Sequence, residues 1–248
     1  MKKLFTLIAA TMLFVGAQAQ TVNIHFKNGA TAYYSGNEVE YVDFNEVTTA
    51  LGKTQRLELG SQTYEWAQTN IGANEEWEYG YYFCWGQART SCTDDISDGI
   101  IFNEDYYTNL GLNNNSYIRN GRFDRDHDAA CVAYNSNSND LKEWHTPTAE
   151  EFNLLVDNCT VTWETSHGVS GKRFTDKNGN SIFIPAAGMR SDGEIGNKDF
   201  FGSYWSSTFF DNQHGCGLNF ESGPYRNRSN EGDVRWYGRP IRACKKIK

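Results

Sequence analysis

The chain has 248 residues and a formal net charge of −8, from 31 acidic and 23 basic side chains. Sequence-independent nucleic-acid binding depends on Lys and Arg set against phosphates, so this acidic balance argues against a nucleic-acid partner. The length suits one sizeable domain with a small appendage.

The first nineteen residues are typical of a secretory signal peptide. Lys2 and Lys3 precede a short apolar stretch at 4–15, and Ala17–Ala19 is a small-x-small cleavage site. No cysteine follows the apolar stretch closely, so we expect no lipoprotein anchor. No later run of about 18 apolar residues occurs, so we expect no transmembrane segment in the mature chain. We therefore expect an exported protein that is secreted or held at the cell surface, with the periplasm as an alternative.

Residues 20–46 predict a small β-strand unit, and residues 47–56 predict a polar linker. Apolar and polar residues alternate, and a Lys-Asn-Gly turn separates the first two runs. The unit is too short to bury a core alone, so we expect it to pack on the main domain or to pair with a partner. The β-type runs are 22–26, 31–34 and 39–44.

Residues 57–248 predict one domain of class α+β. Gly and Asn, which tolerate left-handed turn conformations, separate short β-type runs that dominate the C-terminal half. Phe102–Ser138 is polar and weakly periodic, and we expect it to be rich in loops. The β-type runs are 181–186, 204–208, 216–220 and 234–244.

The clearest helix begins after Thr148. Thr148 and Glu151 fit a capping box, and Phe152 and Leu155 then lie on one helical face. A second, weaker helix is expected at 64–68.

The sequence holds six cysteines at irregular spacings that match no zinc pattern. Export permits disulfides, but a domain of this length can build its own core, so the even count is weak evidence for a disulfide framework. Cys84 and Cys92 are near each other in sequence, and whether they pair stays open.

Candidates for catalysis or metal binding are few. His145 has no partner at a useful spacing, which is more typical of a packed structural residue than of a catalyst. His127 lies between Asp126 and Asp128, but Asp-rich loops are usually solvated turns rather than metal sites. The sequence has no nucleophile elbow, P-loop or dinucleotide fingerprint. We therefore expect no catalytic residue, no bound metal and no cofactor.

Residues 204–242 carry the most informative pattern, because a frame with strand-like spacing is interleaved with residues that follow no packing pattern. Tyr, Trp and Arg dominate binding hot spots, and rigid aromatic side chains give contact area at low entropic cost. We therefore expect the interleaved residues to bind a ligand. The alternative is that they cover the core from an edge strand, with Trp236 the first candidate. The frame is Tyr204, Trp205, Leu218, Phe220 and Ile241, and the expected ligand-binding residues are Phe209, Phe210, Asp211, Asn212, His214, Cys216, Tyr225, Arg226, Arg228, Asp233, Arg235, Trp236 and Tyr237.

Basic residues cluster near the C-terminus, against the acidic balance of the whole chain. A cluster of this kind is usually a solvated face, and we interpret it as a solvent-exposed edge. Its members are Arg226, Arg228, Arg235, Arg239, Arg242, Lys245, Lys246 and Lys248.

Short blocks spread over residues 57–244 point to a family. They are Leu57–Gly60, Trp66–Ala67, Asn70–Ala73, Tyr79–Phe83, Trp85–Gly86, Asp126, Asp128–Ala130, Trp144–Thr148, Glu151–Phe152, Asn178–Gly188, Gly202–Ser207, Leu218–Phe220, Ser222–Gly223 and Arg239–Arg242. Together these blocks resemble the Fibrobacter succinogenes major paralogous domain. The resemblance implies a C-type-lectin-like fold, of the kind also found in formylglycine-generating enzymes. One departure is His145, where the family commonly has Arg.

The C-terminal block also resembles the variable region of lectin-fold proteins that are diversified by retroelements. In that system adenines of a template copy are randomised, so Asn codons become codons for Tyr, His, Asp, Ser, Gly, Arg, Cys or Phe. The interleaved residues of 204–242 are largely of these types. The calcium-linked carbohydrate motifs of true C-type lectins are absent, so calcium-dependent sugar binding does not follow from the resemblance.

The resemblance and the C-terminal pattern together predict an exported, non-enzymatic receptor or adhesin. Its ligand would be a glycan or a protein on another cell, a host or a phage, and its N-terminal unit would dock into a surface or pilus assembly. One alternative is a formylglycine-generating-type or other surface enzyme that uses Cys216 and Cys244. The other is a structural surface or pilus subunit without a diversified site.

Overall fold

A computed structural model describes residues 21–25, 31–35, 53–138, 140–223, 227–228 and 232–248. The chain divides into two compact units, Met1–Glu46 and Val47–Lys248. The expected signal peptide, the expected strand at 39–44 and most of the expected linker lie outside the described residues. In the described residues no helix is both long enough and apolar enough to cross a membrane.

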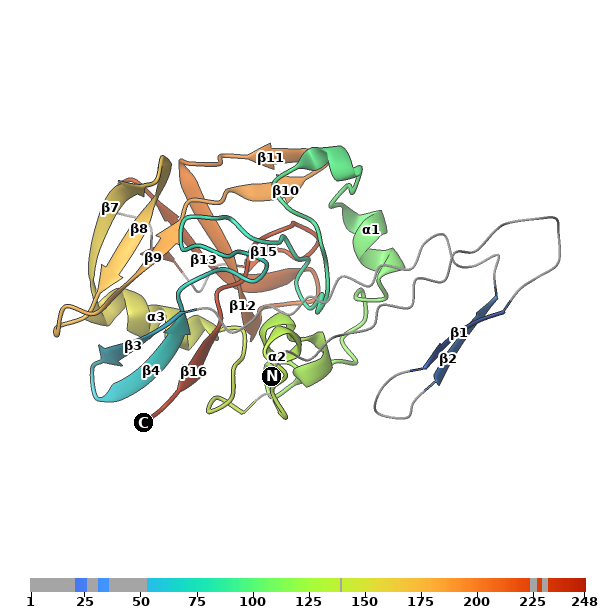
Figure 1. Cartoon of the computed structure of the whole chain (residues 1–248), viewed down its shortest axis with the longest axis horizontal. Helices are drawn as coiled ribbons and strands as arrows, with labels where there is room; N and C mark the ends of the chain where they lie inside the picture. Colours follow the sequence, from blue (N-terminus) through green and yellow to red (C-terminus); the bar gives the residue numbers. More distant parts are fainter. Residues whose placement is uncertain (1–20, 26–30, 36–52, 139, 224–226, 229–231) are drawn as a thin grey trace, which may run out of the picture. The chain divides into compact units, whose positions relative to one another are not determined.

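The first unit contains the antiparallel pair β1 (Thr21–His25) and β2 (Thr31–Ser35), drawn in blue in Figure 1. Thr21 lies opposite Ser35, and His25 lies opposite Thr31. The two strands predicted from the alternating pattern are therefore confirmed, each within one residue of its expected bounds.

The second unit begins with the hairpin of β3 (Thr54–Leu59) and β4 (Gln62–Ala67), and β16 (Cys244–Lys246) pairs with the free edge of β4. Segments from the two ends of this unit therefore lie side by side (Figure 1). The helix expected at 64–68 is wrong, because Gln62–Ala67 is a strand that pairs with β3 on one side and β16 on the other.

A second antiparallel sheet consists of β7 (Thr160–Ser166), β8 (Val169–Thr175) and β9 (Ser181–Pro185). His167 and Gly168 connect β7 to β8 with φ of 51° and 86°, as a tight hairpin turn of type I′ requires. The strand predicted at 181–186 is β9, which packs among the fully buried apolar residues.

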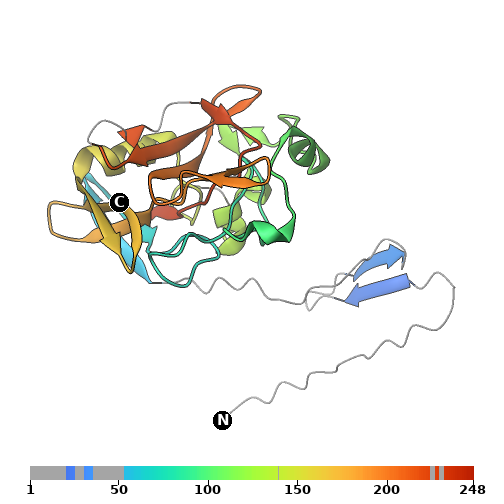
Figure 2. The ribbon, with the colours of Figure 1, turned by 90° about the horizontal axis from the view of Figure 1, so that it is seen from above.

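The largest sheet has the order β14-β13-β12-β6-β5, with β15 also paired to β13. Its centre is the hairpin of β12 (Phe201–Phe209) and β13 (His214–Glu221), which confirms the strands predicted at 204–208 and 216–220. In Figure 2 the orange to red strands of this sheet run across the body of the unit. Its remaining strands are β5 (Ile118–Arg119), β6 (Arg122–Phe123), β14 (Asn227–Arg228) and β15 (Gly232–Val234), and a separate hairpin consists of β10 (Met189–Ser191) and β11 (Glu194–Gly196).

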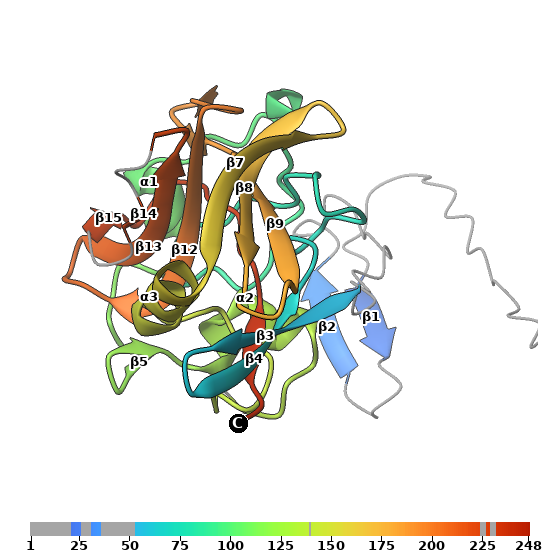
Figure 3. The same ribbon diagram turned by 90° about the vertical axis from the view of Figure 1, so that its left-hand side faces the viewer.

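The helix α3 (Ala149–Asn158) forms where the capping box predicted it. The Thr148 hydroxyl accepts from the backbone N–H of Glu151, and the Glu151 carboxylate accepts from the backbone N–H of Thr148. Phe152 and Leu155 are fully buried where α3 packs on β3, β12 and β13, as Figure 3 shows. This helix therefore joins the first and the largest sheets.

The segment 102–138, expected to be rich in loops, also contains regular structure. It holds α1 (Glu104–Asn109), α2 (Ala129–Ala133) and the 3-10 turn η2 (Arg125–His127), and another such turn, η1 (Ile96–Asp98), precedes it. Asn103 and Asp128 cap α1 and α2 with their side chains. Helices this short span too few turns for an apolar repeat, so the sequence pattern did not predict them.

The interpretation of the basic cluster as a solvated edge is wrong for Arg235, Arg239 and Arg242, which are at most 1% exposed. Arg242 donates to the side chain of Asn70 at 2.8 Å and to the carbonyl of Ala67 at 3.2 Å. Guanidinium groups carry five N–H donors in a planar fork, so they can satisfy several buried carbonyls at once. Counting charges along the sequence does not predict that these arginines are buried and donate to acceptors within the protein.

Candidate ligand-binding face

Three segments of the second unit converge on one surface, which we call the C-terminal face. They are the loop 113–115, the turn 209–214 between β12 and β13, and the segment 233–237 that includes the end of β15. The side chain of Asn115 donates to Asn212 at 2.8 Å, and Arg235 donates to Asn115 at 2.9 Å. Loops that are far apart in the sequence are thus held together by side-chain hydrogen bonds.

Asp211 fixes the turn between β12 and β13. Its carboxylate accepts from the backbone N–H groups of Gln213 and His214, both at 2.8 Å, and contacts Nδ1 of His214 at 2.8 Å. The hydrogen bond from the Gln213 N–H is the main reason that the pKa of Asp211 lies below its usual range. The ring of Phe210 is 50% exposed on this turn.

Arg235 lies beneath the face and is 1% exposed. Its guanidinium packs over the rings of Trp85 and Phe209, with 4.4 Å and 5.0 Å from Cζ to the ring centres. It donates to the carbonyls of His214 and Asp211 as well as to Asn115. Arg235 thus supports the loops of the face from beneath, and it also lines the smaller hollow of that face.

Cys216, another of the predicted ligand-binding residues, is buried at 4% exposure. It lies in β13, and burial raises the pKa of its thiol to about 11. The preceding residue is Gly215, and a Cβ there would lie 2.3 Å from the indole of Trp85. This part of β13 therefore belongs to the core.

Asp233 is engaged within the protein. Its carboxylate accepts from Arg239 at 2.8 Å and from the side chain of Asn219 at 2.7 Å. Burial alone would raise the pKa of Asp233, but the pairing with Arg239 outweighs it and holds the pKa below its usual range. Asp233 thus serves mainly to hold β15 against β13.

The remaining predicted residues form the accessible part of the face. Asn212 is exposed, while His214, Trp236 and Tyr237 are half-buried. Beside them is a hollow of ≈ 100 Å³, and a broader depression of ≈ 540 Å³ follows the turn 209–213. The smaller hollow is lined by Glu104, Tyr107, Thr108, Asn113, Asn212, Gln213, Arg235 and Trp236.

Tyr225, Arg226 and the side chain of Arg228 lie outside the described residues, and the backbone of Arg228 pairs with Asn219 of β13. The sequence pattern did not predict that Glu104, Thr108 and Asn113 line the face. These residues lie far upstream of the predicted block. The Asn-rich run at 113–115 was a local sequence feature that marked Asn113, but it did not mark Glu104 or Thr108.

The side chains of the Asp-rich segment 126–128 have partners within the protein. Asp126 pairs with Arg125 at 2.7 Å, and His127 contacts Asp124 at 2.7 Å. Asp128 is buried and accepts from backbone N–H groups at the start of α2 and from Thr146. Each of these side chains therefore has a structural partner of its own.

His145 has partners that the sequence spacing did not reveal. Its Nε2 lies 2.9 Å from the Glu151 carboxylate and 3.7 Å from the sulfur of Cys244. All three side chains are buried, and β16 brings Cys244 to His145 through a backbone bridge.

None of the six cysteines, all of which belong to the described residues, takes part in a disulfide. Cys84 and Cys92, whose pairing the sequence left open, are both free and buried. Burial raises the pKa of both thiols.

No protein-family model, curated protein or solved structure matches this chain. The argument for function therefore rests on the geometry described above and on the sequence.

Proposed function

We propose that this chain is an exported ligand-binding protein of receptor or adhesin type, and that the C-terminal face is its binding surface. The proposal rests on one observation: exposed side chains lie on loops whose backbone is held in place by hydrogen bonds with Asp211 and Arg235. Asn212 and Gln213 are exposed, Trp236 and Tyr237 are half-buried, and the ring of Phe210 is 50% exposed. Asp211 and Arg235 hold the same loops through bonds to backbone groups.

Loops that are already ordered lose little conformational entropy when a ligand binds. Aromatic and amide side chains on such loops combine rigid contact area with adaptable hydrogen bonding, as antibody loops do. The exposed Asn212 and Gln213 beside Phe210 and Trp236 have this composition. A glycan or a polar protein surface is the ligand class that suits it.

The C-type-lectin-like fold and the resemblance to the major paralogous domain are part of the proposal. It is supported by the burial of the frame, since Tyr204, Trp205, Leu218 and Phe220 are fully buried and Ile241 is 2% exposed. The separation of a buried frame from exposed loop positions also supports diversification by a retroelement. For a diversified gene, we expect an adenine-rich near-copy of its 3′ end and a reverse-transcriptase gene beside it, and their absence from the neighbouring DNA would count against diversification.

Export to the surface and docking of the N-terminal unit into a surface or pilus assembly remain proposals on the sequence features given above. An enzymatic role finds less support. Burial raises the pKa of the Cys216 thiol to about 11 and that of Cys244 well above its usual range, and protonated thiols are poor nucleophiles.

The proposal is tested with Phe210→Ala combined with Gln213→Ala, two exposed side chains of the turn, in the full chain, probed on a printed glycan array and on whole bacterial cells. We expect the wild-type protein to bind a subset of these targets and the double variant to lose at least tenfold in binding, with little change in melting temperature. Phe200→Ala is the matched control, because Phe200 is 75% exposed and lies outside the face. Equal binding by all three proteins, or no binding by the wild type to any target, would contradict the proposal.

A further inference from the structure

Three donor atoms of zinc-binding type converge in the interior, away from the C-terminal face. They are Nε2 of His145, a carboxylate oxygen of Glu151 and the sulfur of Cys244, and all lie within 4.8 Å of one another. His145 precedes α3, Glu151 lies in its first turn, and Cys244 opens β16. Each of the three residues is at most 2% exposed.

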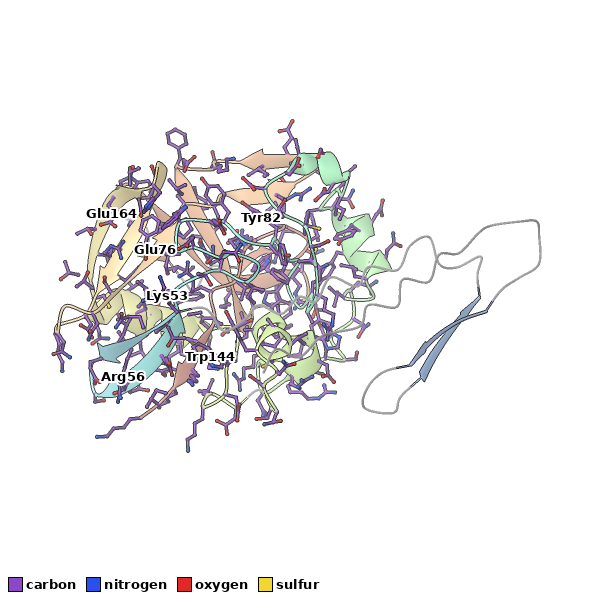
Figure 4. The ribbon with its side chains drawn as sticks, in the orientation of Figure 1. Lys53, Arg56, Glu76, Tyr82, Trp144 and Glu164 are labelled. Atoms are coloured by element: carbon purple, nitrogen blue, oxygen red, sulfur yellow. The ribbon has the colours of Figure 1, made fainter. Side chains whose placement is uncertain are left out.

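The surroundings orient the His145 ring. Its Nδ1 donates to the carbonyl of Glu143 at 2.7 Å, which leaves Nε2 directed at Glu151 and Cys244. A metal-binding histidine almost always donates its other ring N–H to a carbonyl or carboxylate in this way. Trp144 lies beside β16, as Figure 4 shows, and the Lys245 ammonium packs over its ring at 4.9 Å. The segment that carries His145 is therefore fixed against the strand that carries Cys244.

The Glu151 carboxylate has one satisfied oxygen and one unsatisfied oxygen. Oε2 accepts from the backbone N–H of Thr148 at 2.9 Å and faces His145. Oε1 is buried and has no hydrogen-bond partner. A buried carboxylate oxygen without a partner costs free energy, and a cation bound between the three side chains would remove that cost.

We propose that His145, Glu151 and Cys244 bind one zinc ion that stabilises the fold. Thiolate, imidazole and carboxylate together are a donor set that zinc accepts. Zinc–ligand distances of about 2.0–2.3 Å in a tetrahedral arrangement separate the ligand atoms by roughly 3.2–3.7 Å. The Nε2–Sγ distance of 3.7 Å matches this, and a Glu151 carboxylate oxygen lies within 4.8 Å of both atoms. The three side chains would fill three coordination positions of the zinc ion. A non-protein ligand such as water would fill the fourth.

Zinc uptake leaves the net charge of the buried cluster unchanged. Without the ion, His145 faces acceptors with both ring nitrogens and is an imidazolium, Glu151 is a carboxylate and Cys244 is a neutral thiol. Zinc(II) displaces one proton from Nε2 and one from Sγ, which leaves a neutral imidazole, a carboxylate and a thiolate around a divalent cation. Two protons leave as two positive charges arrive, so the interior gains no net charge.

The test is the zinc content of the purified full chain, measured by elemental mass spectrometry, together with its melting temperature before and after dialysis against a chelator. We expect about one zinc per chain, a lower melting temperature after chelation and recovery when zinc chloride is added back. Cys159→Ser is the control, because Cys159 is a half-buried thiol outside the cluster, and this variant should retain the ion. Cys244→Ser should lose it.

His145→Arg separates a zinc site from a simple ion pair. Arginine can pair with Glu151 but does not ligate zinc, so this variant should contain no zinc and its melting temperature should not respond to the chelator. A wild-type protein that contains no zinc and takes up none from zinc chloride would overturn the proposal, whether or not the variants fold. Retention of stoichiometric zinc by Cys244→Ser would overturn it too.

Discussion

The guanidinium of Arg235 lies beneath the C-terminal face and donates to groups on each of the two neighbouring loops. It contacts the carbonyls of Asp211 and His214 on one side and the amide oxygen of Asn115 on the other. Its flat face covers the rings of Trp85 and Phe209. One side chain therefore determines the spacing of segments that are distant in sequence.

Replacing Arg235 by Ala should lower the free energy of unfolding by roughly 3 kcal/mol, because it leaves buried carbonyl groups without donors. Arg235→Lys should recover less than half of that loss, since an ammonium group cannot supply a planar fork of donors. Urea unfolding of both variants measures the effect. Arg56→Ala is the control, because the side chain of Arg56 is 61% exposed and its removal should cost little. Full recovery in Arg235→Lys would show that the fork geometry is unimportant.

Asp98 pairs at the surface with the buried Arg190, and the two terminal guanidinium nitrogens each lie 2.8 Å from one carboxylate oxygen. The hydrogen bonds from Arg190 hold the pKa of Asp98 below its ordinary value of 3.8. The stabilisation is therefore complete above that ordinary value and is lost as the pH falls through the lower folded-state pKa. Cys92 and Tyr82, beside Arg190, have raised pKa values and stay neutral in this range. Asp95 also interacts with Arg190 and Asp98, and the hydrogen bond from the Ser97 N–H holds its pKa below the ordinary value, so it titrates in the acid range too.

Asp98→Asn should accordingly unfold more easily than the wild type at pH 7, by roughly 1–2 kcal/mol. The difference should persist at pH 5 and shrink at pH 3 and below, where the wild-type carboxyl becomes protonated. Urea unfolding at these three pH values measures it. A difference as large at pH 2 as at pH 7 would rule out the ion pair as its source.

Among the elements, α3 was predictable because its start carries a chemical signature and its length allows an apolar repeat. Thr148, Glu151, Phe152 and Leu155 all take the positions that the pattern predicted. The strand β4 was mistaken for a helix because five residues cannot distinguish the two periods. What decided its conformation was pairing with β3 on one side and β16 on the other, which are tertiary contacts.

Thr148→Ala should destabilise the domain by about 1 kcal/mol, because the backbone N–H of Glu151 loses its side-chain acceptor. Thr148→Ser keeps a hydroxyl at the same place and should unfold close to the wild type. Chemical denaturation compares the three proteins. Equal losses in the Ala and Ser variants would point to the lost methyl group rather than to the cap.

For the whole molecule, the sequence predicted the buried frame of the largest sheet but only part of the candidate site. Tyr204, Trp205 and Leu218 are core residues because apolar spacing along a strand reflects burial directly. Glu104 and Asn113 reach the face only because the fold brings a distant loop and helix to it, and no local pattern carries that information. The burial of Arg235 was equally unpredictable, since its partners are mostly backbone carbonyls, which leave no trace in a residue pattern.

The pairing of β4 with β16 also determines the order of events during synthesis. Arg242 donates to a carbonyl 175 residues earlier in the chain, and the backbone N–H of Ala67 donates to Ala243. The first hairpin of the second unit thus lacks its outer strand until residues near 244 have been made. Contacts of such long range slow folding, because the loop must close before they contribute. Under the proposed export, the first sheet of the second unit would be completed only after the segment of β16 has crossed the membrane.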